Sequence, residues 1–360
     1  MIERPFSLNT LQMTTKFSSL PVVDVGLLTS PIGAYPKEEA ALSKRLYEVF
    51  ATTGFAYLTN IPLSFKHEDV FNLSRQFFAL PIDQKMRLAR RSFNKDNENT
   101  YRGYFPTQPE SASDNLKEGF EIGPARPIQT ASSVPSSAKF DLTEPNVWPN
   151  EADFSAQSDL ERLYVELQTL ASKLLSLLAF SLGQPADFFA PYLEDSLSTL
   201  RLLHYPSVVP SASRSTPASS DVKLSCTSHT DSGILTLLHQ DSTGGLEVRN
   251  SSGEWVAAPY IPESLVVNIG DLMARVSGGR FVATMHRVRS PIMDTSAAPV
   301  NGHSETVHLG RMSVPFFFEP GENCVVRSIE GNEGFVIYGE HVRSKMKTWV
   351  EFQDDEKDEN

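Results

Sequence analysis

Cysteine is nearly absent from this 360-residue chain, and its scarcity excludes two common ways of stabilising a protein. Only Cys226 and Cys324 occur, far apart and outside any Cys-x-x-Cys spacing. A disulfide-rich scaffold and a thiolate zinc cluster both need more cysteines at closer spacings. The sequence therefore predicts a protein of a reducing compartment.

An excess of basic residues and a long apolar run are absent too. The chain has 32 Lys and Arg against 44 Asp and Glu, which gives a formal charge of −12. This balance disfavours partners whose phosphates must be neutralised, so we expect no nucleic-acid or membrane partner. No stretch approaches eighteen consecutive apolar residues, and the N-terminal MIERPFSLNT has no apolar signal-peptide core. With 40% hydrophobic residues, we expect a folded, soluble, cytoplasmic protein, with a monomer as the default state.

The first two hundred residues favour helices with a few strands. Residues 20–28 and 54–62 are β-branched or aromatic runs, and each is followed by a helical pattern, the second ending before Pro81. Ser, Pro, Asn and Asp dominate residues 94–149, which predicts surface loops with little regular structure. Leucines three and four apart predict the strongest helix, from Asp159 to Gly183.

After Leu200 the pattern changes to many short strands separated by Gly, Pro, Asn and Asp, which is typical of a sandwich or barrel. Two polar segments, residues 207–221 and 294–308, interrupt this pattern and are expected to be surface loops. The acidic end, DDEKDEN, favours solubility and predicts no site.

One tripeptide predicts a metal site. His229 and Asp231 stand two residues apart in SHTDSGILTLL, so on an extended chain both side chains point to the same face. An isolated His-x-Asp also arises by chance, and a third ligand is needed. His286, 57 residues later in another strand-like segment, is the candidate. Two imidazoles and one carboxylate form the facial triad of non-haem Fe(II) oxygenases, which leaves coordination positions open.

A second pair of residues suits a carboxylate ligand. Arg311 and Ser313 share one face of the predicted strand in GRMSVPFFFEP, while Met312 and Val314 point to the other face. A guanidinium beside a hydroxyl can hold a carboxylate in a bidentate fashion. An unpaired arginine in such an apolar strand would otherwise be costly.

With these motifs the sequence resembles the 2-oxoglutarate and Fe(II)-dependent dioxygenases of the isopenicillin N synthase-like family. The resemblance covers most of the chain, because the family's segments occur in its order: PVVDV, GFAYLTNIP, RGYFP, LKEGFEIG, LRLLHYP, HTDSGILTLLHQD, GGLEVRN, NIGDLMARVSGGRFVATMHRV and RMSVPFFFEP. It implies a mainly β fold with α-helices, in which a double-stranded β-helix, a distorted jelly roll, carries N-terminal and intervening helices.

The resemblance also assigns roles to individual residues. His229, Asp231 and His286 match the iron ligands, and Arg311 with Ser313 matches the clamp on the distal carboxylate of 2-oxoglutarate. Tyr205 matches a tyrosine that often binds the same carboxylate; the alternative is a core aromatic residue. Leu203 replaces an asparagine frequent in plant members, which puts one polar contact in doubt.

We divide the chain into an N-terminal α/β region (1–125), a loop and long helix (126–194), a jelly-roll core (195–325) and a C-terminal segment with the acidic tail (326–360). The 294–308 insert lengthens the separation of the last ligand from the clamp and is either a lid or a passive loop. Its histidines, like His204 and His239, are expected to be ordinary structural or surface residues. We assign Asn268 to turn chemistry. Pocket wall and core remain alternatives for three aromatic residues, Tyr104, Phe120 and Phe318.

The implied activity is the oxidation of a small organic molecule, with 2-oxoglutarate and O2 converted to succinate and CO2. Hydroxylation, desaturation and rearrangement stay open, and ascorbate is expected to support the Fe(II) centre. The amino-acid sequences of the motifs favour an enzyme that tailors a microbial, fungal-like secondary metabolite. The alternatives are an oxygenase of this fold that needs no 2-oxoglutarate, a catabolic dioxygenase for a small acid or base, and a non-catalytic jelly-roll binding protein.

Overall fold

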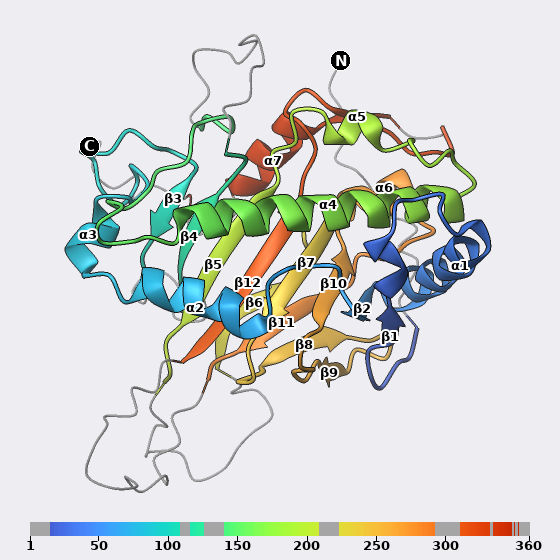
Figure 1. Cartoon of the computed structure of the whole chain (residues 1–360), viewed down its shortest axis with the longest axis horizontal. Coiled ribbons are helices and arrows are strands. Elements are labelled where there is room, and N and C mark those ends of the chain that lie inside the picture. The colour runs from blue at the N-terminus through green and yellow to red at the C-terminus, as the bar shows by residue number, and fades with distance from the viewer. Residues whose placement is uncertain are drawn as a thin grey trace, which may run out of the picture.

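The computed structural model of the chain is built on two main β-sheets, with a layer of helices on the outer face of the larger one (Figure 1). It describes residues 15–108, 116–125, 140–208, 223–291, 310–331 and 334–347, together with Trp349 and Phe352. The expected inserts and the acidic tail lie largely or wholly outside these residues.

The larger sheet has eight strands, and all its pairings are antiparallel except that of β1 with β2. Across the sheet its strands are β1 (Val22–Asp24), β2 (Phe55–Thr59), β10 (Leu265–Ile269), β7 (Leu235–Gln240), β12 (Arg311–Phe318), β5 (Thr199–Tyr205), β4 (Glu118–Ile122) and β3 (Gly103–Phe105). Neighbouring strands such as β12 and β5 come from distant parts of the chain, as a jelly roll requires.

The smaller sheet has four strands in the order β6 (Leu224–His229), β11 (His286–Arg289), β8 (Leu246–Arg249) and β9 (Trp255–Ala257). A separate pair, β13 (Val325–Val326) and β14 (Val336–Ile337), lies near the C-terminal end. Together the eight-stranded and four-stranded sheets form the double-stranded β-helix expected from the sequence.

Side-chain alternation divides the apolar core into two layers. On β5, Leu203 and Tyr205 pack with Val248 and Val288 of the smaller sheet, so they lie between the sheets. The intervening Leu202 belongs to the other core, which lies between the larger sheet and the helices. On β12 the expected packing of Met312 and Val314 in that helix-side core is confirmed, and the alternate residues, including the predicted clamp, therefore face the space between the sheets.

Seven α-helices and one 3-10 helix complete the described part of the chain: η1 (Gly26–Thr29), α1 (Pro36–Thr52), α2 (His67–Phe78), α3 (Ile82–Met86), α4 (Gln157–Ser181), α5 (Ala190–Leu193), α6 (Asp271–Val276) and α7 (Tyr338–Met346). The predicted leucine helix is α4, which crosses the outer face of the larger sheet and packs against α1 (Figure 1). By length and composition α4 could also span a membrane, but its apolar side is buried in the core of this fold.

Two strands of the larger sheet, β3 and β4, interrupt the surface loops expected over residues 94–149. β4 lies inside the larger sheet beside β5, and its Phe120 and Glu121 are both almost fully buried. Phe120 stacks on Phe77 of α2 with ring centroids 4.1 Å apart. The polar surroundings of β4 in the sequence concealed a strand of only five residues.

Candidate metal centre and cosubstrate site

Two neighbouring strands and the turn after one of them bring three potential metal ligands together. His229 ends β6 and faces His286, the first residue of β11, across a direct strand pair. Asp231 follows two residues after His229, and its Oδ1 lies 3.7 Å from the Nε2 atom of each histidine. All three ligand atoms lie within 4.8 Å of one another, and no other such group occurs among the described residues.

Both imidazoles are oriented by their backbones. His229 Nδ1 lies 2.7 Å from the carbonyl oxygen of Thr227, and His286 Nδ1 lies 3.1 Å from that of Thr284. Because a carbonyl oxygen can only accept, each Nδ1 donates, and each Nε2 keeps its lone pair for a ligand. Phe55 packs edge-on against His286 and fixes its ring further.

Asp231 is prepared in the same way. Its Oδ2 accepts hydrogen bonds from Thr236 Oγ1 at 2.6 Å and Asn268 Nδ2 at 2.7 Å, which leaves Oδ1 directed at the histidines. Burial alone would raise the pKa of Asp231, but the two imidazoles and these two hydrogen bonds lower it below its ordinary value. A charged carboxylate and two Nε2 lone pairs suit a divalent transition metal such as Fe(II).

The predicted clamp lies on β12, between the sheets. Arg311 is 1% exposed, and its Nε donates to the carbonyl oxygen of Gly244 at 2.7 Å. Its Nη1 is buried without a hydrogen-bond partner among the described residues. Ser313, also 1% exposed, lies two residues along the same face. A buried guanidinium nitrogen without a partner beside a hydroxyl fits the carboxylate of 2-oxoglutarate, which would satisfy it.

Tyr205 lies directly opposite Arg311 in the β5–β12 pairing. The guanidinium carbon of Arg311 is 4.8 Å from the centre of the tyrosine ring, so the ring supports the cation with its face. Leu203, which replaces the asparagine of some plant members, pairs with Ser313 and adds an apolar wall there.

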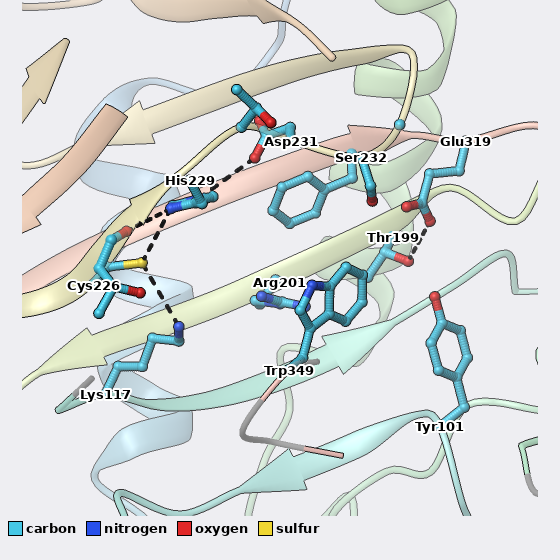
Figure 2. Close-up of a pocket in the computed structure, with 14 residues that line it drawn as sticks. Tyr101, Lys117, Thr199, Arg201, Cys226, His229, Asp231, Ser232, Glu319 and Trp349 are labelled. Carbon is cyan, nitrogen blue, oxygen red and sulfur yellow. Dashed lines mark hydrogen bonds and ion pairs between the residues drawn. The ribbon is translucent and has the colours of Figure 1, made fainter. Parts of the chain in front are cut away.

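A pocket of about 210 Å³ opens beside the metal ligands. Figure 2 shows His229, Cys226 and Lys117 at one side of it, Trp349 and Arg201 in the middle, and Thr199 with Glu319 at the opposite side. Lys117 Nζ and His229 Nδ1 each lie 3.8 Å from the sulfur of Cys226. The walls of the pocket thus combine the metal ligands with polar groups from β5 and from the end of β12.

Arg201, in the middle of this pocket, is positioned by a buried carboxylate. Glu121 of β4 forms ion pairs with Arg201 and with Arg90, and both Glu121 and Arg90 are almost fully buried. Glu319 accepts a hydrogen bond from Thr199 Oγ1 at 3.4 Å. Burial raises the pKa of Glu319 to about 7 against the opposing effects of Tyr338 and of nearby arginines.

The sequence prediction missed several residues of the site. Asn268 was assigned to a turn, but it lies in strand β10 and binds Asp231, so that assignment is wrong. Thr236 follows Asp231 by five residues. No local sequence pattern marks Thr236 or Asn268 as a hydrogen-bond partner of Asp231. No local sequence pattern marked Arg201 and Glu319 as site residues either. They line the same pocket only because β5 pairs with β12.

The histidines and aromatic residues outside the predicted site have structural positions. His204 hydrogen-bonds Glu118 at 2.8 Å, and Tyr104, Phe120 and Phe318 are core residues that do not line the pocket. His239 is fully buried, so it is a structural residue of the core, and it lies directly opposite Val314 in the β7–β12 pairing.

Two family models match the chain. Residues 197–320 match the 2OG-Fe(II) oxygenase superfamily, and residues 20–151 match the N-terminal region of non-haem dioxygenases in morphine synthesis. The first match contains all the metal-ligand candidates and the clamp.

Similar proteins come from fungi and plants. A proline hydroxylase of Petromyces alliaceus is 30% identical over 82% of this chain and 86% of its own length. A homoarginine-6-hydroxylase of Arabidopsis thaliana is 30% identical over 93% of this chain and 99% of its own. Among solved structures, a full-length Neurospora crassa protein in complex with alpha-KG and thymine is 27% identical, with a TM-score of 0.72 over 92% of this chain and 97% of that one.

Proposed function

Since the chain belongs to the 2OG-Fe(II) oxygenase superfamily, as an enzyme that uses Fe(II) and 2-oxoglutarate, we propose that His229, Asp231 and His286 hold its iron. Their convergence within 4.8 Å is the single observation that carries this assignment. Three protein ligands on one face leave room for a cosubstrate and for O2.

The proposed cosubstrate residues are Arg311, Ser313 and Tyr205. The buried Nη1 of Arg311 and the Ser313 hydroxyl would bind the distal carboxylate, and the Tyr205 ring would hold the guanidinium in place. Binding here also orients 2-oxoglutarate, because the clamp fixes the end of the molecule that does not react.

The enzyme is a dioxygenase that acts on a small molecule. The bound iron supplies the activation of O2, and the protein supplies placement and a site shielded from water. We infer a hydroxylation, in which substrate, O2 and 2-oxoglutarate give hydroxylated substrate, succinate and CO2. Desaturation and rearrangement are alternative outcomes at the same site.

For the biological role we propose tailoring of a fungal-like secondary metabolite in the cytoplasm. Its support is that relatives of about 30% identity come from fungi, among them the proline hydroxylase. The two hydroxylases and the Neurospora crassa protein share one property, since proline, homoarginine and thymine are all small nitrogen-containing molecules. A substrate of that size fits the observed pocket.

The test uses the full chain with Fe(II), 2-oxoglutarate and ascorbate. Under anaerobic conditions we expect the coloured Fe(II)–2-oxoglutarate chelate, and under air a slow release of succinate. Asp231→Ala removes the charged ligand, so both signals should disappear. Asp159→Ala is the matched control, because the Asp159 side chain is 49% exposed on α4 and pairs only with Arg162 in the described structure. Chelate formation by Asp231→Ala equal to that of the parent chain would refute the ligand assignment.

A further inference from the structure

The turn between α1 and β2, residues 53–55, contacts the segment that carries His286. Thr284 donates its hydroxyl hydrogen to the carbonyl oxygen of Thr53 at 2.8 Å, although 231 residues separate the two along the chain. Both threonines are buried. The carbonyl oxygen of the same Thr284 accepts a hydrogen bond from His286 Nδ1 at 3.1 Å. Two hydrogen bonds in series therefore join the end of α1 to a proposed iron ligand.

The centre of this turn requires a glycine. Gly54 has a φ of +71°, and a Cβ built on it would lie 2.2 Å from the carbonyl oxygen of Val282 and 2.4 Å from Thr284 Oγ1. Any side chain at this position would push residues 282–284 away from the turn. The close approach of the two segments thus depends on the absence of a side chain.

Phe55, the last residue of the turn, reaches the surroundings of two proposed ligands. Its ring packs edge-on against the imidazole of His286, with the ring centres 5.2 Å apart. In the pairing of β2 with β10, Phe55 lies opposite Asn268, whose side-chain amide donates to Asp231. The turn therefore contacts both a histidine ligand and the residue that orients the carboxylate ligand.

The segment before β11 depends on such contacts because it belongs to no helix or strand. Residues 282–285 have no regular secondary structure. The backbone N–H of Val282 donates to the carbonyl oxygen of Phe50 in α1 at 2.9 Å. The carbonyl oxygen of Met285 accepts from the backbone N–H of Arg249 in β8 at 2.8 Å. The first half of the segment is thus held by α1 and its turn, and the second half by the smaller sheet.

We propose that residues 53–55 and Thr284 are positioning residues of the metal centre, which fix the tautomer and the tilt of the His286 ring. A histidine offers Nε2 to a metal when its Nδ1–H is bound by a fixed acceptor, and here that acceptor is the Thr284 carbonyl oxygen. The bond to Thr53 holds Thr284 in place, and Phe55 limits the tilt of the imidazole. These residues act on the metal only through the ligands.

This inference rests on the proposed iron site and extends that site into the N-terminal part of the chain. All three proposed ligands lie within residues 197–320, whereas the turn lies within residues 20–151, which match a different family model. The alternative is that the bond between Thr53 and Thr284 only stabilises the fold, as a buried hydrogen bond does anywhere in a protein. The two possibilities differ in their effect on metal binding.

The first test replaces Thr284 in the metal-free full chain. Thr284→Val keeps the shape but loses the hydroxyl, and Thr284→Ser keeps the hydroxyl. Co(II) is titrated under anaerobic conditions, and both its dissociation constant and its visible absorption spectrum are recorded, because the spectrum depends on the ligand geometry. We expect Thr284→Val to change the spectrum and to weaken Co(II) binding about 10-fold, the lower end of the range for an outer partner of a ligand. Thr284→Ser should restore the spectrum and bring the affinity within about threefold of that of the parent chain.

Ser43→Ala is the matched control for the lost hydroxyl. Ser43 donates to the carbonyl oxygen of Leu177 at 2.7 Å, and this bond is also buried and also joins distant segments, but it lies where α1 packs on α4. Urea denaturation should show a loss of stability in both Ser43→Ala and Thr284→Val. Only Thr284→Val should alter the binding and the spectrum of Co(II).

A second pair of variants tests the turn itself. Gly54→Ala and Gly183→Ala both place a side chain at a positive φ, +71° and +76°, but a Cβ on Gly183 meets nothing within 4 Å. The backbone strain is therefore similar, and only Gly54→Ala displaces residues 282–284. We expect weaker Co(II) binding and a changed spectrum in Gly54→Ala alone. If a variant of one pair does not fold, the other pair decides.

The outcomes separate this inference from the proposed function. If the parent chain binds Co(II) no better than Asp231→Ala does, the iron assignment is wrong and the inference falls with it. If the parent chain binds Co(II) and Asp231→Ala does not, an affinity and a spectrum in Thr284→Val equal to those of the parent chain overturn the inference alone. An equal loss of Co(II) affinity in Ser43→Ala overturns it as well, because the effect would then be one of general stability.

Discussion

Asn268 donates from its side-chain amide to Asp231 Oδ2 across 2.7 Å, and this bond determines which carboxylate oxygen faces the two histidines. Thr236 donates to the same oxygen, so Oδ1 alone stays directed at the Nε2 atoms. Residues that are not ligands themselves therefore orient the carboxylate of the proposed metal site.

Replacing Asn268 should weaken metal binding without removing a ligand. We expect Asn268→Ala to lower Fe(II) affinity by about 10- to 100-fold, the usual cost of losing an outer hydrogen bond to a ligand. Titration with Fe(II) or Co(II) under anaerobic conditions measures it. Asn72→Ala is the control, because Asn72 is exposed on α2. An affinity unchanged from that of the parent chain would show that Thr236 alone orients Asp231.

Arg311 provides the second prediction. Replacing one member of a buried charge-assisted pair costs about 2–5 kcal/mol, so Arg311→Met should raise the 2-oxoglutarate concentration needed for half-maximal chelate formation at least about 30-fold. Arg311→Lys should show a smaller increase, since it keeps the charge but loses the planar fork. Arg289→Met, at a side chain 52% exposed, is the control. If Arg311→Met binds 2-oxoglutarate normally, another residue holds the carboxylate.

The sequence predicted those features that depend on local spacing. An i, i+2 pattern places Arg311 with Ser313, and leucines three and four apart predict α4, as the structure confirms. The convergence of His286 on His229 was also expected, because a third ligand was needed and His286 lies in another strand-like segment; the family resemblance then supported it across the 57 residues that separate them.

Features that depend on strand pairing could not be derived in the same way. Asn268 reaches Asp231 because β10 pairs with β7, and Glu319 meets Thr199 because β12 pairs with β5. β4 was missed for a related reason, since its buried Glu121 is tolerated only through arginines contributed by other segments. Charge in a sequence predicts exposure, whereas here it is paired inside the protein.

Glu319 should make stability depend on pH in a direction opposite to that of most carboxylates. Burial raises its pKa from 4.5 to about 7, so the folded chain binds the proton more tightly than the unfolded chain. Stability from this group is thus fully present below pH 4.5 and is lost as pH rises to about 7, by about 3 kcal/mol in total.

Urea denaturation of the metal-free protein from pH 4.5 to 8 measures this effect. Glu319→Gln has no such titration, so its free energy of unfolding relative to that of the parent chain should increase by about 3 kcal/mol over this range. A difference independent of pH would mean that Glu319 stays ionised in the folded protein.

His239 should make the stability of the folded protein fall in the acid range. It is fully buried between α2 and the larger sheet, its ring is 5.3 Å from that of His67, and burial with this neighbour lowers its pKa from 6.5 to about 3. The folded chain therefore resists protonation that the unfolded chain accepts. Stability from this group is present above pH 6.5 and is lost as pH falls toward 3, because charging His239 would bury an uncompensated cation.

The variant His239→Leu removes this titration and replaces the buried imidazole with an apolar side chain of similar size. At pH 7.5 we expect its stability to stay within about 1 kcal/mol of that of the parent chain, since the backbone at Val314 offers the imidazole a single hydrogen bond. Between pH 6.5 and 4 its advantage should grow by about 1.4 kcal/mol per pH unit, the full effect of one proton taken up on unfolding. Urea titrations at several pH values test both statements. A loss of several kcal/mol in His239→Leu at pH 7.5, with an unchanged dependence on acid, would contradict both statements.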